Sequence, residues 1–219
     1  MKYLLTVLVF AQITYAQEVK SPGVLVLTPL DFALDESLAS EAKKYEITMT
    51  DEQVQQCIAI YQERDEREIV RKMHQAECEF ARESDISTSF TFYTYGWLTF
   101  KLYGAFDDAI IYPIKGQVNR ELQDFQNLAS AYKINWIVNI KLVSFESLSD
   151  GLSGKVSFEL WNQNVGEIVQ SETIEIDSRN RGMEMSCDDG ELGCLVTNGA
   201  IFTASKVLET MYSDKKYWQ

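Results

Sequence analysis

The chain has 219 residues, of which 46% are hydrophobic and 24% charged, a composition that suits one globular domain with a substantial core. Its 33 acidic residues outnumber its 20 basic residues, and the formal charge of -13 argues against a nucleic-acid-binding protein, because phosphates would repel it. A single histidine excludes most metal sites that are built from histidine ligands.

The first 16 residues have the three parts of a secretory signal peptide. Lys2 supplies the positive start, an apolar run extends from Leu4 to Phe10, and Thr14-Tyr15-Ala16 ends the segment with a small-x-small pattern. The apolar run is shorter than the roughly 20 residues of a membrane-spanning helix, so a cleaved signal is favoured over a retained anchor. We expect a mature chain of residues 17–219, with 33 acidic and 19 basic residues and a charge of -14. It would be a single domain, secreted or periplasmic, without a transmembrane segment.

The expected domain begins with a buried strand and continues with helices. Residues 23–29 form a continuous apolar run between two prolines, which is typical of a buried strand, and residues 35–46 are predicted as a short helix. Thr50-Asp51-Glu52-Gln53 is a capping box that begins a longer helix, whose apolar stripe is interrupted near Asp65 and then resumes.

Export would place the four cysteines in an oxidising compartment, where an even number indicates two disulfides. Cys187 and Cys194 enclose a short loop with two glycines, so this pair is favoured and leaves Cys57 to pair with Cys78. In one straight helix Cys57 and Cys78 would lie roughly 31 Å apart, whereas a disulfide needs Cα atoms within about 7 Å. Either the segment folds back near residues 64–67, which we favour, or these cysteines stay free or pair elsewhere. No cysteine lies near the expected cleavage site, so lipid attachment there is not expected.

Residues 89–106 are predicted as a strand, because large side chains alternate with period two and aromatic residues are frequent. Gly96 would mark a bulge or a turn. One side of this strand would present a flat aromatic platform, and we name its members as the candidate binding residues: Tyr93, Tyr95, Trp97 and Tyr103. Such side chains stack on sugars and anchor protein interfaces, although a helix that covers them as ordinary sheet packing is the alternative.

The second half alternates strands and helices. Its elements, in order, are a strand at 109–114, a helix at 118–132, a strand at 134–143, strands at 155–161 and 167–176 joined by a hairpin turn at 162–166, and a helix at 197–212. The fold class is therefore α/β (α+β): a mixed sheet with helices packed on it, a helical segment inserted after the first strand, and a C-terminal helix.

Three segments of this pattern carry a family resemblance. The helix end Asn127-Leu-Ala-Ser-Ala-Tyr132 runs into the strand Trp136-Ile-Val-Asn-Ile140, and a later turn reads Asn164-Val-Gly-Glu-Ile-Val169. Together with residues 24–30, these resemble the α/β domain of the TolB N-terminal region, CsgG and the LpoB-type activators of cell-wall synthases. The resemblance covers residues 23–32 and 109–212, and it implies an envelope-associated domain that binds proteins without catalysis. Val165 stands where the family has Thr.

Catalytic and metal-binding interpretations are weak. His74, the only base of its kind, lies among the charges of a helix, so a solvated or capping histidine is favoured over a catalytic one. His74 and Cys78 have a metal-ligand spacing, but an oxidised cysteine cannot bind as thiolate. Asp188, Asp189 and Glu191 crowd one loop without an EF-hand pattern, which favours a polar turn over calcium.

The sequence thus predicts an exported protein that is not an enzyme and needs no metal or cofactor. Its partner would be another envelope or extracellular protein, and its acidic charge would favour a basic one. Two alternatives stay open: a secreted hydrolase acting on polysaccharide through carboxylates that no spacing singles out, and a glycan or small-molecule carrier.

Overall fold

The computed structural model describes residues 22–62, 67–106, 108–115, 120–178 and 190–213. The expected signal peptide at 1–16 lies outside these ranges. So do Cys187, and with it the predicted Cys187–Cys194 pair, and Asp188 and Asp189 of the acidic loop.

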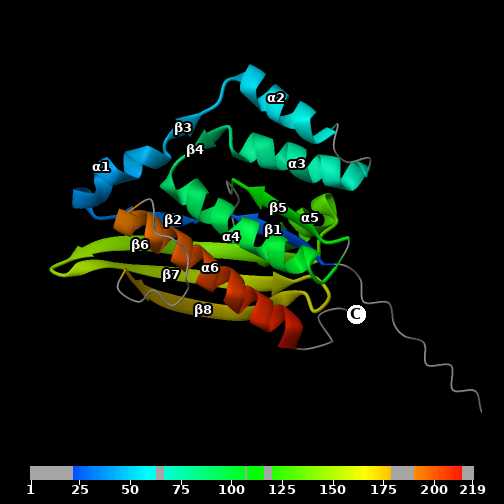
Figure 1. Ribbon diagram of the computed structural model, residues 1–219. Helices are drawn as coiled ribbons and strands as arrows, with labels where there is room; N and C mark the ends of the chain where they lie inside the picture. Colours follow the sequence, from blue (N-terminus) through cyan, green and yellow to red (C-terminus); the bar gives the residue numbers. More distant parts are fainter. Residues whose placement is uncertain (1–21, 63–66, 107, 116–119, 179–189, 214–219) are drawn as a thin grey trace, which may run out of the picture.

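Within the described residues, a mixed six-stranded sheet forms the centre of the molecule (Figure 1). Its strands lie in the order β5-β1-β6-β7-β8, with β2 beside β6. The strands are β1 (Gly23–Leu27), β2 (Asp31–Leu34), β5 (Ile110–Ile114), β6 (Trp136–Leu148), β7 (Gly151–Asn162) and β8 (Glu167–Asp177). β1 pairs in parallel with β5 and β6, whereas β6, β7 and β8 form an antiparallel meander. The predicted α/β fold with a mixed sheet is therefore confirmed.

β1 and β2 lie end to end along β6. β1 pairs with the segment from Trp136 to Asn139, and β2 pairs with the segment from Leu142 to Phe145. Between them, β6 shifts register, and Pro29, which has no N–H to donate, separates the two short strands. The strand predicted at 23–29 is thus real but ends at Leu27, and β2 is an element that the sequence analysis missed.

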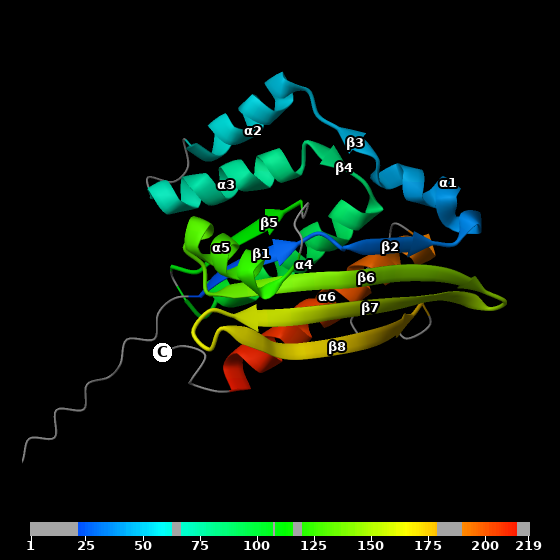
Figure 2. The same ribbon diagram turned by 180° about the vertical axis from the view of Figure 1, so that it is seen from behind.

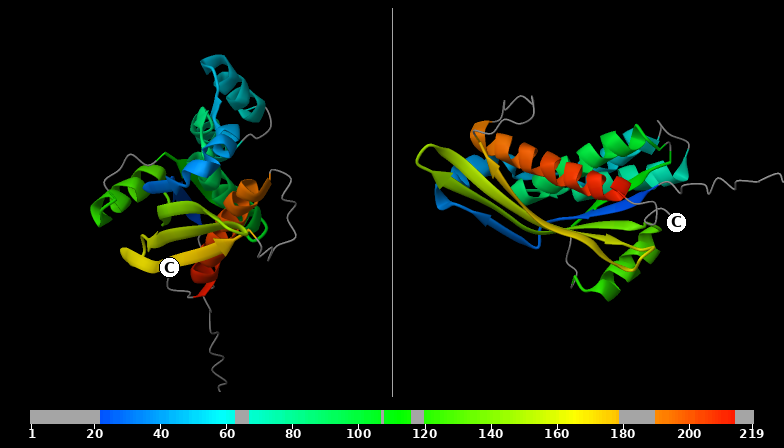
Figure 3. Two further views of the ribbon diagram at one scale, coloured as in Figure 1. Left: turned by 90° about the vertical axis from the view of Figure 1, so that its left-hand side faces the viewer. Right: turned by 90° about the horizontal axis from the view of Figure 1, so that it is seen from below.

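Helices cover the two faces of the sheet unequally (Figures 2 and 3). The long helices α4 (Ile86–Tyr103) and α6 (Gly190–Ser213) pack on one face, while α5 (Leu122–Tyr132) lies on the other. β1 contributes to both cores, Val24 and Val26 to the α4/α6 side, Leu25 and Leu27 to the α5 side. A strand that is buried on both faces needs apolar residues at every position, which explains its unbroken apolar run.

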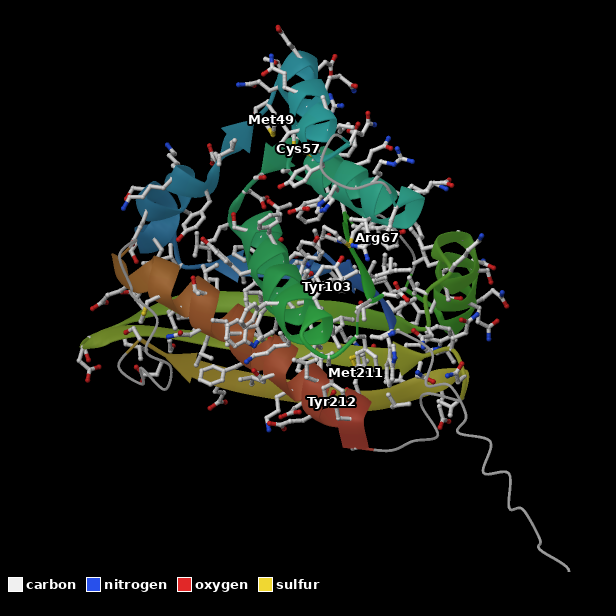
Figure 4. The ribbon with its side chains drawn as sticks, turned by 45° about the vertical axis from the view of Figure 1, so that its right-hand side comes forward. Met49, Cys57, Arg67, Tyr103, Met211 and Tyr212 are labelled. Carbon is white, nitrogen blue, oxygen red and sulfur yellow. A yellow bond between two sulfur atoms is a disulfide. The ribbon has the colours of Figure 1, made fainter. Side chains whose placement is uncertain are left out.

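A helical hairpin joined by a disulfide stands at the β5 side of the sheet. α2 (Asp51–Gln62) and α3 (Glu68–Phe80) are bridged by Cys57 and Cys78, whose Cα atoms are 6.0 Å apart (Figure 4). The predicted fold-back is therefore confirmed, and these cysteines are neither free nor paired elsewhere. The predicted capping box is also present, since the Thr50 N–H donates to Gln53 Oε1 at 2.8 Å and the Gln53 N–H to Thr50 Oγ1 at 3.3 Å.

The remaining elements differ from the predictions mainly at their ends. The helix predicted at 35–46 is a series of short turns: η1 (Glu36–Leu38), α1 (Ala39–Ala42) and η2 (Lys43–Tyr45). It is followed by a small ladder of β3 (Ile47–Thr48) and β4 (Glu83–Ser84), which was not predicted. α6 begins seven residues before its predicted start at 197. No helix of the described residues combines the length and apolarity that crossing a membrane requires.

Candidate functional site

The segment that was predicted as an aromatic strand is the helix α4, so the prediction of a strand at 89–106 was wrong. Asp85 caps the helix: its Oδ1 accepts from the Thr88 N–H at 2.7 Å, and the Asp85 N–H donates to Thr88 Oγ1 at 2.6 Å. The threonines inside the helix bond to the preceding turn, as in the 3.0 Å bond from Thr94 Oγ1 to the Phe90 carbonyl. These local bonds satisfy polar groups that would otherwise disfavour a buried helix.

The strand prediction failed because two periods coincide in this segment. Phe90, Thr94, Leu98 and Leu102 are buried and follow each other at intervals of four, which is the spacing of one helix face. Positions four apart also share parity, so they fit a period of two equally well. The capping residue Asp85 and the uninterrupted length of 18 residues were the signals that favoured a helix.

The four predicted binding residues do not share one surface, because successive helical residues are rotated by about 100°. Tyr93 and Tyr103 are exposed and Trp97 is partly buried, but Tyr95 is only 4% exposed. The Tyr95 hydroxyl points toward α3, where it donates to Glu77 Oε2 at 3.5 Å. Burial, reinforced by the charge of Glu77, raises the pKa of Tyr95. Tyr95 is therefore a packing residue of the interface between α3 and α4.

Two aromatic residues at even-numbered positions lie on the exposed surface instead of Tyr95. Phe100 is 67% exposed and Phe92 is 37% exposed, and neither was among the predicted binding residues. We define the α4 aromatic face as Phe92, Tyr93, Trp97, Phe100 and Tyr103, which surround Gly96. A helical wheel places these five within about 140° of the helix circumference. That projection would have found the face in the sequence, had the segment been assigned as a helix.

The α4 aromatic face carries very little charge. Lys101 is the only charged residue of α4, and its Nζ lies over the rings of Trp97 and Phe100, 4.8 and 5.4 Å from their centroids. The helix contains no carboxylate, although the whole chain has a net charge of -13. Figure 4 shows this helix with Tyr103 beneath the α2–α3 hairpin and beside α6. An apolar helix surface of this kind is suited to burial against another molecule.

His74 is not the solvated or capping residue that the sequence suggested. Its ring stacks on Tyr61 of α2, with centroids 4.1 Å apart, and its Nδ1 lies 3.0 Å from Glu77 Oε2. Glu77 thus contacts both His74 and Tyr95. This polar cluster fixes the hairpin to α4, which is a structural role.

The described residues offer no group of three potential ligands that could hold a metal ion. Cys78 is oxidised in the disulfide, so the thiolate required by the pair of His74 and Cys78 is not formed. Of the acidic loop considered for calcium, the described Glu191 lies exposed in the first turn of α6.

Arg120 closes the end of the parallel part of the sheet, where ligands bind in many α/β proteins. Its guanidinium donates to the carbonyls of Thr28 and Ile140 at 2.6 and 2.7 Å, and to Asn139 Oδ1 at 2.8 Å. Burial lowers the pKa of Arg120. These bonds tie the connection before α5 to the ends of β1 and to β6, so the side chain serves as a structural clamp.

Depressions in the described surface also lie away from α4. A groove of about 480 Å³ between α3, β5 and α5 is lined by Tyr112 and Tyr132, whose rings are 5.5 Å apart, and by an ion pair in which Lys72 Nζ lies 2.8 Å from Glu68 Oε1. A second depression, of about 500 Å³, lies on the antiparallel strands and contains the acidic residues Glu146, Glu175 and Asp177 beside Lys155. The described residues that line this second depression include no aromatic side chain on which a sugar ring could stack.

Comparisons with known proteins place few constraints on this chain. No protein-family model matches it, and no protein of curated function matches its sequence. Among solved structures, a hypothetical protein from Chlamydia trachomatis is similar at 10% identity and a TM-score of 0.40, over 88% of this chain and 99% of that chain. A Helicobacter pylori protein described as a homolog of neuraminyllactose-binding hemagglutinin is similar at 13% identity and a TM-score of 0.35, over 90% of this chain and 88% of that chain.

Proposed function

We propose that the chain is an exported, non-enzymatic domain that binds another envelope or extracellular protein through the α4 aromatic face. The observation behind the proposal is that α4 is apolar on both sides: one side enters the core, and the other exposes aromatic rings without a carboxylate. Aromatic residues are enriched and charges are depleted at the centres of protein interfaces.

The charge distribution supports a protein partner over an anionic one. The chain carries a net charge of -13, whereas the one charged residue of α4, Lys101, is positive. This combination fits a partner with an apolar centre and a basic rim, because complementary charges steer association and suppress wrong partners. It disfavours nucleic acids and anionic lipid surfaces.

The proposal also includes the export of the chain and its resemblance to a family of envelope proteins. The signal-like segment at 1–16 and the Cys57–Cys78 disulfide support a secreted or periplasmic location, since disulfides persist in oxidising compartments. The resemblance to the TolB N-terminal region, CsgG and the LpoB-type activators supports a role in binding envelope proteins. The parallel β1–β6 pair, followed by a meander and a C-terminal helix, is compatible with that resemblance.

A carrier of small molecules or glycans is the second candidate function, and the groove between α3 and α5 favours it. Tyr132 is partly exposed there and would stack on a ring, while the Lys72–Glu68 pair and Lys133 would bind polar groups. The groove is open, and fewer aromatic side chains line it than form the α4 aromatic face. We therefore rank the carrier function second. A polysaccharide hydrolase would need two carboxylates that face each other across a substrate, and Glu146, Glu175 and Asp177 are the described candidates.

Photo-crosslinking in the producing cells tests the proposed function. The photoreactive residue p-benzoylphenylalanine would replace Phe100, the most exposed aromatic residue of α4, and in a control it would replace Thr173, an exposed residue of β8 on the opposite side of the sheet. We expect a protein adduct from position 100 that is absent from position 173, and direct binding of that protein, once purified, to the domain. No protein adduct at position 100, or the same adducts at both positions, would contradict the proposal.

A further inference from the structure

We infer that the partner element which binds the α4 aromatic face is an α-helix of a basic protein, and that it crosses α4 at Gly96. This inference rests on the proposed function and specifies the structure and the charge of what is bound. Two independent features of α4 lead to it: the spacing of its exposed residues and the position of a glycine that the domain itself does not need.

Four of the exposed residues of α4 follow the spacing of a helix–helix contact. Tyr93, Gly96, Phe100 and Tyr103 succeed one another at steps of three, four and three residues. This is the spacing of a seam that packs against a second helix, in which side chains of one helix insert between those of the other. Along this seam the small residue Gly96 lies between the aromatic residues Tyr93 and Phe100. The surface therefore offers both protruding rings and gaps that a partner's side chains can fill.

Gly96 has no internal reason to be glycine. It lies exposed near the middle of an 18-residue helix, with helical geometry, where glycine is less stable than alanine. A Cβ atom built on Gly96 would meet no atom within 4 Å.

Gly199 of α6 provides the contrast, because there a Cβ would meet side chains inside the domain. Its Cβ would lie 2.7 Å from Ile176 Cδ1 and 3.1 Å from Phe90 Cε2. Gly199 permits close packing inside the domain, whereas Gly96 leaves the same kind of space open on the outside. Close approach of an external backbone explains it.

Charge favours a basic partner over a second copy of this chain. Two copies would each bring a charge of -13, and this like charge opposes their association. Four exposed rings of 37–67% exposure, each with about 150–250 Å² of surface, provide roughly 350 Å², so a partner that buries about 800 Å², as in a stable interface, also contacts surface beside these rings. A helix with an apolar stripe and basic flanks would cover the rings and also be attracted to the net negative charge of the chain.

Substitutions at Gly96, combined with the cross-linker at position 100, test the inference on the full chain. Gly96→Ala adds one methyl group to the seam, and Gly96→Leu fills the gap; Ser130→Leu, on the exposed side of α5, is the matched control. Because alanine favours helix, we expect Gly96→Ala to raise the melting temperature by about 1–4 °C, and yet to lower the adduct yield at least fivefold. Gly96→Leu should abolish the adduct, and Ser130→Leu should leave its yield unchanged.

The outcomes separate this inference from the proposed function. If position 100 forms the same protein adduct in the wild type and in both Gly96 variants, the crossing at Gly96 is wrong while the binding surface stands. If the adduct peptide of the partner maps to a non-helical segment, to an acidic protein, or to a second copy of this chain, the inference is overturned. If the wild type forms no protein adduct, the proposed function itself fails.

Discussion

Glu77 links the helical hairpin to the core at the level of single residues. Its Oε2 lies 3.0 Å from His74 Nδ1 and accepts from the Tyr95 hydroxyl at 3.5 Å, and His74 in turn stacks on Tyr61. Tyr61 comes from α2, His74 and Glu77 from α3, and Tyr95 from α4, so the cluster fixes the relative rotation of these helices. It also explains why Tyr95 is buried while Tyr93 is exposed.

The pH dependence of stability tests the burial of Tyr95. An unfolded tyrosine titrates near 10, and burial raises the pKa of Tyr95 above that value in the folded state. The stabilisation is therefore complete below pH 10 and is lost as the pH rises above it, at about 1.4 kcal/mol per pH unit. Urea unfolding between pH 8 and pH 11 should show this slope. The slope should be shallower by that amount in Tyr95→Phe, and equal slopes in the two proteins would show that Tyr95 is accessible.

At the scale of elements, α4 shows what could and what could not be predicted from the sequence. Among the residues predicted from the sequence, Tyr93 and Tyr103 are exposed and Trp97 is partly exposed, and their role in binding stays a prediction. The type of element was wrong, because intervals of four satisfy periods of two and of 3.6 alike. Because of this error, Tyr95 was placed on the binding face, and Phe92 and Phe100 were left out of it. Recognising Asp85 as a helix cap would have corrected the assignment.

Strand β1, the turn between β7 and β8 and the α2–α3 hairpin were more predictable than α4, because the sequence marks each of them. The apolar run of β1, the hairpin turn at 162–166 and the capping box at Thr50 are local signals, and each lies where the sequence placed it. The Cys57–Cys78 pair added a distance constraint that forced a bend. β2 carries no such signal, since its four residues depend on pairing with β6, over 100 residues away.

Gly199→Ala should destabilise the domain, in contrast to Gly96→Ala. The added Cβ would collide with Ile176 and press on Phe90, which outweighs the helix preference of alanine of roughly 1 kcal/mol. We expect a net loss of about 1–2 kcal/mol in the free energy of unfolding, measured by urea denaturation. If Gly199→Ala were as stable as the wild type, the packing of α6 against α4 and the sheet would be looser than described.

Removal of the disulfide should loosen α2 before the sheet. Apart from the bridge, α2 is held by a small cluster centred on Val54 and Ile58, by the stacking of Tyr61 on His74 and by the ion pair of Asp51 with Arg82. The bridge spans 21 residues, for which chain entropy predicts a contribution of about 3 kcal/mol. In Cys57→Ala/Cys78→Ala, hydrogen exchange followed by mass spectrometry should show faster exchange in α2 and unchanged protection in β6 and β7. Uniform acceleration throughout the chain would indicate that the hairpin unfolds together with the core.

At the scale of the whole molecule, the sheet is covered by long helices on one face and only partly covered on the other (Figure 3). The face of the antiparallel strands that the long helices leave uncovered carries polar side chains, as Ser157 and Thr173 illustrate with a 2.8 Å contact between their hydroxyls, although Leu148 and Ile168 of these strands are exposed. Among the described residues, α4 carries more exposed large apolar side chains than any other element. The sequence predicted the helices and the sheet but not this distribution, because it depends on how α3, α4 and α6 pack together.

The net charge predicts a strong effect of salt on association with the partner. Complementary charges accelerate encounter, and salt screens them with a Debye length of about 10 Å at 0.1 M and about 3 Å at 1 M. Between 0.05 M and 0.5 M salt, the association rate measured by surface plasmon resonance should fall at least tenfold, with a much smaller change in the dissociation rate. An association rate that does not depend on salt would contradict a basic partner.

Truncation of Phe100 tests the central claim most directly. Because Phe100 is 67% exposed, Phe100→Ala should change the free energy of unfolding by less than about 0.5 kcal/mol. Isothermal titration calorimetry with the protein that cross-links at position 100 should show a dissociation constant at least 30-fold higher, as for a central interface residue. Ile60→Ala, which truncates an exposed apolar residue of α2, should bind like the wild type. Wild-type affinity in Phe100→Ala would contradict a binding role for the α4 aromatic face.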